Sequence, residues 1–407
     1  MPKNRLWAAY PATYRAREVK ILAGWIAAGE SGSVVGLPGC GRSNLLGFMC
    51  HRPEVVGSYL PAENRRVALI PVDLNNLPAN NLSTLYRVIL RAFYRVSDQF
   101  EPLLQQAITA VFKENRTQTD PFLPQSALQE LLLLCQAQPI QVVLVLNHFD
   151  RFFQQATPPM VNTLRGLRDD FKDTLCYIAD MPQEAAYLPD PGALGHMYEL
   201  LDNYICWVGA LTGTDARTLI ARVTRTAAIP PSEAEISAML ALTGGFPALL
   251  RAVCHWWLAA APPPPPDEWA DRLLTERSID YRLRRIWEAL TQEEQFTLSE
   301  LQRLQTTPAE FKQTAGEFGQ RRRSLLNRLA DKGVCRRAEI GWRVSGELLL
   351  AYVTEAGGRG RGRIWLDEAS GDIYQGQTRL KDLTDLERSV LTFLIKQPRF
   401  RHPKTEL

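Results

Sequence analysis

Four residues near the start of the chain have nearly the types and spacing of a phosphate-binding loop. The pattern for such a loop is Gly, four residues, Gly, Lys, then Ser or Thr. The segment GLPGCGRS places Gly36, Gly41 and Ser43 correctly, but Arg42 stands at the lysine position. The backbone N–H groups of such a loop point into one concavity at a helix N-terminus, where they bind phosphate oxygens. The chemistry that this segment predicts is therefore the binding of a nucleotide phosphate.

Seven residues in and beside this loop are expected to hold ATP or ADP. They are Gly36, Gly39, Cys40, Gly41, Arg42, Ser43 and Asn44. The hydroxyl of Ser43 is the expected protein ligand of a Mg²⁺ ion, as in other loops of this pattern.

A strand, a turn and a helix must position this loop. SGSVVGL is typical of a short buried strand, and SNLLGFMCH of the start of a helix. Further strands are predicted at 66–77, 138–152, 174–181 and 204–211, with helical stretches between them. Uninterrupted apolar runs are typical of parallel strands that are covered on both faces. Strands that alternate with helices predict a doubly wound α/β domain, whose ligands bind at the carboxyl ends of the strands.

Length and composition limit the class of protein. The chain has 407 residues, which indicates several domains, and 45% of them are hydrophobic and 22% charged. No apolar run approaches the roughly 20 residues that span a bilayer, and the first residues lack an apolar signal segment. We therefore expect a cytoplasmic protein that does not bind a membrane.

The cysteines and histidines do not predict a metal centre. The seven cysteines are scattered without a CxxC pair, and the five histidines never occur at metal-ligand spacing. An odd number of cysteines also argues against a disulfide framework. Most of the cysteines lie in apolar stretches, where a thiol behaves as a small hydrophobic group.

The chain has, in order, the P-loop, a second strand, an acidic third strand and the late segment LTGGFPALLRAV. In this order of features it resembles the STAND/AAA-like P-loop ATPases over roughly residues 8–355. YPATYRAREVK resembles the Arg-Glu box that precedes the loop in that family. The resemblance implies an α/β fold: a P-loop NTPase parallel sheet with a helical lid, followed by winged-helix domains. It also implies that Gly245 to Pro247 lie near the adenine, so Pro247 is a candidate cofactor-binding residue. The alternative for this Gly-Gly-Phe-Pro segment is a turn that starts a helix.

The catalytic acids of that family are missing from this sequence. In the family the third strand ends in an acid that holds Mg²⁺ through water and a second acid that positions the attacking water. Here those positions hold Asn147 and His148. Asparagine is neutral, and imidazole does not match the reach of glutamate, although it can take up a proton near neutral pH. We therefore expect no catalytic residues and an ATPase that is inactive or very slow.

Arg42 adds a third departure, because a forked guanidinium is not equivalent to a compact ammonium. Each defect at such a site costs on the order of 10²-fold in rate. Asp150 is a candidate metal ligand that would replace the missing acid, or else the N-cap of a helix. Arg165 and Arg168 are either arginine fingers or part of a solvated helix face, and Arg251 is a candidate phosphate sensor.

The second half of the chain divides by composition. We expect the P-loop domain at 1–211, the helical lid at 212–280 with a stiff Pro-rich spacer at 261–267, and a winged-helix domain at 281–356. In the recognition helix, Leu325, Leu326 and Leu329 are expected to face inward, with Gly333 as the C-cap. The candidate DNA-binding residues are Arg321, Arg322, Arg323, Arg336 and Arg337.

The last segments are a basic Gly linker at 357–363 and a unit at 364–407. This last unit resembles the start of the OmpR-type DNA-binding domain, without the helix that reads the major groove in that family. A partial domain is expected to expose apolar surface that favours docking on another protein.

Charge is distributed unevenly along the chain. Residues 282–407 hold 23 Lys and Arg against 17 Asp and Glu, whereas the first 281 hold 24 against 27. A net charge of +6 in the C-terminal third favours double-stranded DNA as a partner, although an ordinary solvated surface explains it as well.

The sequence therefore predicts a STAND-like regulatory protein that binds ATP or ADP and acts in transcription regulation as a switch or scaffold. The winged helices of such a protein would bind DNA, a protein partner or a second copy of the chain. Two alternatives remain open. One is an active ATPase that drives oligomer assembly. The other is a nucleotide-free interaction subunit of a related ATPase complex.

Overall fold

A computed structural model of the chain describes residues 5–61, 66–260, 263–306, 318–339, 341–356, 364–367, 370–375, 378–380 and 383–396. The chain forms two compact units, Met1–Val208 and Gly209–Leu407, and each is described here by itself.

The first unit is built on a five-stranded parallel sheet with the strand order β2-β3-β4-β1-β5. Its strands are β1 (Gly32–Val35), β2 (Arg66–Asp73), β3 (Ile140–Asn147), β4 (Leu175–Met181) and β5 (Ile205–Trp207). Every residue of β1 and β4 is buried, as the uninterrupted apolar runs predicted. The expected parallel sheet is confirmed, and the sheet order places β4 beside β1 although about 140 residues separate them in sequence.

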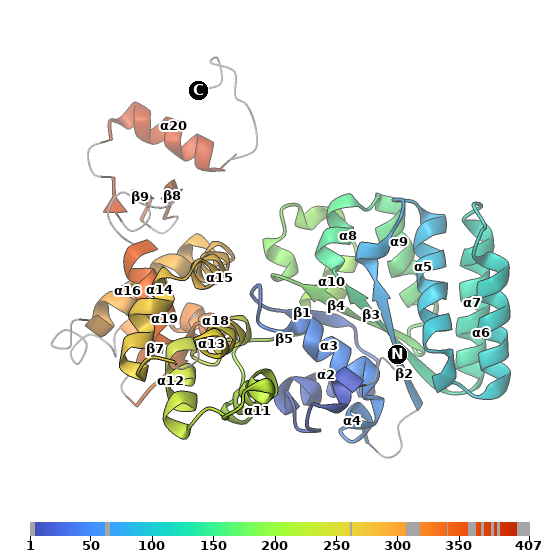
Figure 1. Ribbon diagram of the computed structural model, residues 1–407. Helices are drawn as coiled ribbons and strands as arrows, with labels where there is room; N and C mark the ends of the chain where they lie inside the picture. Colours follow the sequence, from blue (N-terminus) through green and yellow to red (C-terminus); the bar gives the residue numbers. More distant parts are fainter. Residues whose placement is uncertain are drawn as a thin grey trace. The chain divides into compact units, whose positions relative to one another are not determined.

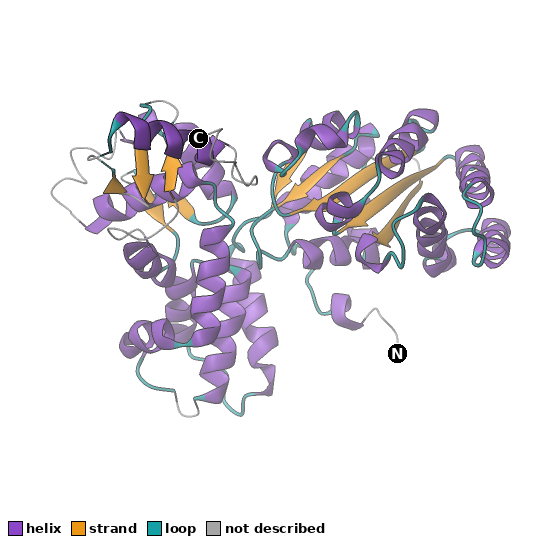
Figure 2. Ribbon diagram, turned by 90° about the horizontal axis from the view of Figure 1, so that it is seen from above, coloured by secondary structure: helices purple, strands orange, loops and turns teal. Residues whose placement is uncertain are grey.

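Helices cover both faces of this sheet (Figures 1 and 2). They are α1 (Arg5–Ala8), α2 (Ala16–Ala28), α3 (Arg42–His51), α4 (Pro53–Gly57), α5 (Leu82–Arg95), α6 (Pro102–Asn115), α7 (Phe122–Ala137), α8 (Phe149–Gln155), α9 (Pro158–Asp170) and α10 (Met197–Asp202). An extensive apolar cluster joins β2, β3 and β4 to α5, α7 and α9. Because a strand, the glycine loop and α3 follow one another directly, the first unit has the fold expected of a P-loop ATPase.

The second unit starts with a helical region. Its helices are α11 (Gly213–Val223), α12 (Glu233–Thr243), α13 (Pro247–Ala259), α14 (Trp269–Thr275) and α15 (Arg277–Glu288). A capping box between Ser232 and Glu235 begins α12. In the part of the Pro-rich spacer that the structure describes, Pro265 has the backbone angles of polyproline II, φ −57° and ψ 144°.

A winged-helix arrangement follows within the same unit. It comprises α16 (Gln292–Thr306), α18 (Arg323–Asp331), β6 (Cys335–Arg337), β7 (Trp342–Val344) and α19 (Glu347–Ala356). Leu326 and Leu329 are fully buried, as predicted, but Leu325 is only half-buried. Gly333 follows α18 in the left-handed conformation, with φ +80°, which confirms its predicted role. In the turn of the wing, Gly341 has φ +70°, whereas Ile340 lies outside the described residues.

The C-terminal segment forms a small antiparallel sheet and a helix. The sheet has the order β10-β9-β8, and its elements are β8 (Ile364–Leu366), β9 (Ile373–Gln375), β10 (Thr378–Arg379) and, after the sheet, α20 (Asp385–Lys396). None of the described side chains of α20 is buried, and Leu386 is 72% exposed. The exposed apolar surface expected for this segment is therefore present. The Gly linker at 357–363 lies outside the described residues.

All seven cysteines are buried, and none forms a disulfide. Among the described residues, no helix is long and apolar enough to cross a membrane.

Candidate functional site

The predicted phosphate loop connects β1 to α3 and has the backbone that a phosphate cradle requires. Gly39 and Gly41 have φ +87° and +96°, a region that L-residues with side chains rarely adopt. A Cβ atom on Gly36 would lie 2.5 Å from the carbonyl oxygen of Val208, so only glycine fits there. Ser43 is exposed in the first turn of α3. The backbone and the hydroxyl therefore fit a nucleotide phosphate, which the N-terminus of α3 also favours.

A buried arginine donates a hydrogen bond to the backbone of this loop. Arg15, in the segment that resembles an Arg-Glu box, is 2% exposed, and its Nη2 donates to the Cys40 carbonyl over 2.7 Å. Its Nη1 lies 3.4 Å from the carboxylate of Glu18. Burial raises the pKa of the Cys40 thiol, although Arg42 and Arg15 act in the opposite direction. Cys40 is therefore a packed, protonated side chain and not a nucleophile.

The side chain of Arg42 makes an ion pair inside the first unit. Its Nε lies 3.1 Å from Oδ1 of Asp180, which is in β4 and is 2% exposed. The sheet brings them together, because Asp180 is the register partner of Val34 in β1. The sequence analysis did not identify Asp180. The only signal available was an acid inside the buried strand LCYIADM.

The carboxyl end of β3 holds the two positions where acids were expected. Asn147 is the register partner of Asp73 at the end of β2. His148 has φ +59° and is the N-cap of α8. Asp150 lies in the first turn of α8, so the alternative that Asp150 caps this helix is wrong. In the described part of the chain, no group of three or more His, Cys, Asp or Glu side chains could hold a metal ion.

The pKa of the Asp180 carboxyl depends on its burial and on its charged neighbours. Burial raises its pKa above the usual range, and the charges of Arg42 and His148 and the His148 N–H only partly offset that effect. Asp150 adds to the increase because it is a second negative charge nearby. Among the groups that lower the pKa of this buried acid, Arg42 has the largest effect.

The other arginines considered in the first unit are engaged within it. Nε of Arg165 lies 2.9 Å from Oδ2 of Asp169, and Arg168 donates to the carbonyl of Gly29 over 2.8 Å. Arg168 is only 9% exposed. The alternative that it belongs to a solvated helix face is therefore wrong for this residue.

The Gly-Gly-Phe-Pro segment lies in the second unit. Gly244 and Gly245 have φ +58° and +75°, and Pro247 is the first residue of α13. This geometry confirms a turn that starts a helix, because proline at that position lacks only an N–H that would be unpaired anyway. Arg251 is exposed on α13.

The predicted DNA-binding arginines lie at the start of α18 and on the wing. Arg321, Arg323, Arg336 and Arg337 are exposed, and Arg323 begins α18. Arg336 is the register partner of Arg343 across the two-stranded wing. A hollow of about 390 Å³ lies between α18 and the wing; the described residues that line it include Arg323, Asn327, Arg337, Glu339 and Trp342.

Arg322 differs from its two neighbours. Its guanidinium lies 5.2 Å from the centre of the Phe296 ring, and Nη2 lies 3.6 Å from Oε2 of Glu300. Phe296 also contacts Trp365 and Tyr374, whose rings stack 4.9 Å apart. Arg322 thus belongs to an aromatic cluster that joins α16 to the small sheet of the C-terminal segment.

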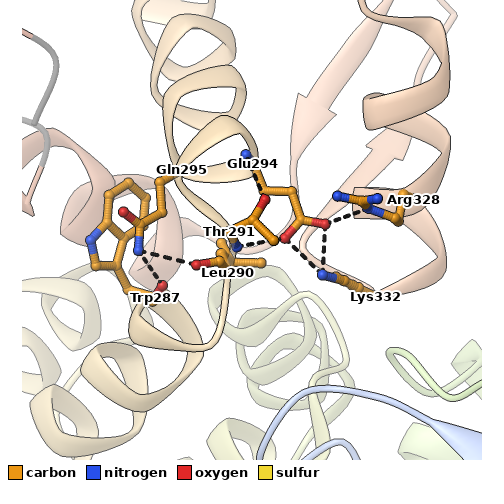
Figure 3. Close-up of polar contacts among 7 residues, drawn as sticks. All are labelled: Trp287, Leu290, Thr291, Glu294, Gln295, Arg328 and Lys332. Carbon is orange, nitrogen blue, oxygen red and sulfur yellow. Dashed lines mark hydrogen bonds and ion pairs between the residues drawn. The ribbon is translucent and has the colours of Figure 1, made fainter. Parts of the chain in front are cut away.

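A buried carboxylate holds α16 against α18, and sequence reasoning did not find it (Figure 3). Nζ of Lys332 lies 2.6 and 2.7 Å from the two oxygens of Glu294, and Nε of Arg328 lies 2.7 Å from Oε1. The N–H of Thr291 donates to Oε2 over 2.8 Å. Burial alone would raise the pKa of Glu294, but Lys332, Thr291 and Arg328 outweigh it and hold that pKa below the usual range.

The chain is similar to several solved structures at low sequence identity. It is similar to the Walker-type ATPase PABY2304 of Pyrococcus abyssi, with 14% identity over 86% of this chain and 99% of that chain and a TM-score of 0.45. It is also similar to the ORC2 protein of Aeropyrum pernix in ADPNP-ADP complexes, with 13% identity, coverage of 84% and 91%, and a TM-score of 0.41.

A third similar structure is the ORC1 protein of Aeropyrum pernix in complex with DNA, with 13% identity, coverage of 83% and 91%, and a TM-score of 0.35. No protein-family model and no curated protein matches the sequence. Because these identities and TM-scores are low, the fold rests on the sheet order and the phosphate loop described above.

Proposed function

We propose that this protein is a STAND-like regulator whose first unit holds ADP or ATP without rapid hydrolysis. The observation that carries this proposal is the ion pair between Arg42 and Asp180, whose Nε and Oδ1 lie 3.1 Å apart. This ion pair engages Arg42, which is the cation of the P-loop. Asn147 and His148 stand at the positions where two acids would act on Mg²⁺ and water. Phosphoryl transfer depends on positioned charges, so these replacements remove catalysis and leave the backbone cradle.

Two assays with one pair of variants test this proposal. We expect magnesium-dependent phosphate release from ATP to stay at the uncatalysed background, while fluorescent ADP binds measurably. Gly41→Ala should abolish ADP binding, because residue 41 has φ +96° in the cradle. Gly57→Ala is the matched control, because its added methyl group meets no atom within 4 Å and its φ is ordinary.

The two alternatives are outcomes of the same assays. Rapid magnesium-dependent turnover would identify an active ATPase, in which Asp150 takes the metal role together with Ser43. No ADP binding by folded wild-type protein would identify a nucleotide-free interaction subunit.

We propose double-stranded DNA as the partner of the second unit, in keeping with transcription regulation. The observation that favours it is the group of exposed arginines at the start of α18 and on the wing, with Arg323 and Arg337 on either side of one hollow. Phosphate contacts of this kind give most of the affinity for a duplex. The predicted division into a lid at 212–280, a winged helix at 281–356 and an OmpR-like segment at 364–407 forms part of this proposal.

A charge-matched comparison tests the DNA proposal. The triple variant Arg323→Ala, Arg336→Ala, Arg337→Ala should weaken binding of a labelled duplex at least tenfold in anisotropy titrations. The control triple Arg277→Ala, Arg284→Ala, Arg285→Ala removes the same charge from the exposed surface of α15. Equal losses in the two triples would show that only net charge matters and would contradict a site at the wing.

A further inference from the structure

The inference concerns Asp180, which neither the motif nor the missing acids explain. This residue is in β4, between β3 and β1 in the sheet, and is 2% exposed. An ionised carboxylate at such a position is costly unless it is paired. Its charged neighbours are Arg42 from α3, His148 from the end of β3 and Asp150 from α8. Asp180 therefore lies beside the side chain that the phosphate loop would present to a nucleotide.

The ion pair uses the guanidinium of Arg42 only in part. Nε lies 3.1 Å from Oδ1 of Asp180, but Nη1 of Arg42 is buried without a hydrogen-bond partner in the described part of the structure. Oδ1 likewise lacks a well-aligned hydrogen bond, so attraction of charge rather than a bidentate contact holds the pair. A phosphate offers several oxygens, which suit the unused donors of a forked guanidinium better.

We infer that Asp180 is a built-in competitor of the nucleotide phosphates, pairing with Arg42 until phosphate in the loop displaces it. This inference rests on the proposed function and adds the way in which nucleotide binding is held back. Phosphate binds only to those molecules in which Arg42 has left Asp180. The apparent affinity for phosphate is therefore reduced in proportion to the fraction of such molecules. Displacement also leaves a buried carboxylate without its cation, which adds to the cost of binding.

The test compares the affinity for fluorescent ADP, with and without Mg²⁺, of wild-type protein and of Asp180→Asn. The substitution removes the charge and nearly keeps the shape, so we expect ADP to bind about tenfold tighter. Asp73→Asn is the matched control, because it removes one negative charge at the carboxyl end of β2 and should leave the affinity unchanged. In the double variant Arg42→Ala, Asp180→Asn the gain should disappear, since Arg42 is the group set free.

The outcomes separate this inference from the proposed function. If wild-type protein binds ADP and Asp180→Asn binds no tighter, the competitor role is wrong and the proposed function stands. If only Asp180→Asn binds ADP, the competitor role holds and the wild-type protein is not a nucleotide holder. If neither binds while circular dichroism shows both folded, both statements fail. Asp180→Ser, smaller and also neutral, replaces Asp180→Asn if the latter does not fold.

Discussion

At the scale of single residues, the buried carboxylate of Glu294 is a centre of polar contacts in the second unit. The carboxylate is fully buried and accepts from Lys332, Arg328 and the Thr291 N–H, so both of its oxygens have hydrogen-bond partners. Arg328 and Lys332 connect the first turn of α16 to the end of α18, whereas Thr291 directly precedes α16 and caps it. The orientation of α18 relative to α16 therefore depends on one charged side chain.

The substitution Glu294→Gln tests this dependence. It leaves the ammonium of Lys332 buried without its counter-charge, and breaking a buried pair in this way costs about 3–5 kcal/mol. Urea unfolding followed by circular dichroism should show that loss. Glu300→Gln is the control: its pair with Arg322 is longer, at 3.6 Å, and partly exposed, so it should cost no more than about 1 kcal/mol. Equal losses would contradict a special role for the buried carboxylate.

The contribution of Glu294 should also depend on pH. Its folded-state pKa is lowered from 4.5, so the stabilisation is present above the unfolded-state pKa and is lost as the pH falls through the folded-state pKa. The difference in free energy of unfolding between wild-type protein and Glu294→Gln should therefore be constant near neutral pH and shrink below about pH 4.5. Urea titrations at a series of pH values measure it. A difference that persists unchanged in acid would show that the carboxyl acts through packing alone.

Single residues also show what sequence reasoning could and could not predict. The cradle residues of the loop were predictable because the motif is contiguous and its glycines have a steric reason. Asp180 was not, because its contact with Arg42 depends on β4 lying next to β1, and no local pattern encodes that order. Glu294 was missed for a similar reason: its partner Lys332 is 38 residues away, and the acid looks like part of a polar helix start.

At the scale of elements, glycines in the left-handed conformation occur where the backbone turns. Gly333 ends α18 with φ +80°, and a Cβ atom there would lie 2.3 Å from the backbone nitrogen of Ala210. Gly371, between β8 and β9, has a similar φ of +71° but no atom within 4 Å of its added Cβ. The two positions share a conformational constraint and differ in packing.

Alanine substitutions at these two glycines separate the two effects. Gly371→Ala should cost about 1–2 kcal/mol, the price of the left-handed conformation for an L-residue. Gly333→Ala should cost clearly more, because backbone atoms of Ala210 must also move. Thermal unfolding of both variants measures the comparison. Equal shifts in melting temperature would mean that the close approach to Ala210 relaxes without cost.

Elements of the first unit were more predictable than those of the second. The strands β2, β3 and β4 begin within two residues of their expected starts, because continuous apolar runs define them. The expected range 138–152 was wrong at its end, because β3 ends at Asn147 and α8 begins at Phe149. The aromatic contact of Phe296 with Trp365 and Tyr374 was not predictable, since it joins elements about 70 residues apart. It also changes the interpretation of the basic segment, because it engages Arg322.

At the scale of the whole molecule, the uneven charge of the chain fits the placement of the exposed arginines. The C-terminal third carries the net positive charge, and the second unit presents Arg323, Arg336 and Arg337 at the start of α18 and on the wing. Charge counting alone treats every arginine as equal. The structure distinguishes them, because Arg322 is held by Glu300 and the Phe296 ring while its neighbour Arg323 lines the hollow.

This distinction predicts different salt dependences for two adjacent arginines. The logarithm of the duplex-binding constant should fall linearly with the logarithm of the salt concentration, with a slope of about −0.9 for each phosphate that the protein neutralises. Arg323→Ala should reduce the size of that slope by about 0.9, because one phosphate contact is lost. Arg322→Ala, which removes the same charge one residue away, should leave the slope nearly unchanged. Anisotropy titrations between about 50 and 200 mM salt measure both slopes. If the two variants change the slope equally, the aromatic cluster does not withhold Arg322 from DNA, and the whole basic segment acts as one contact surface.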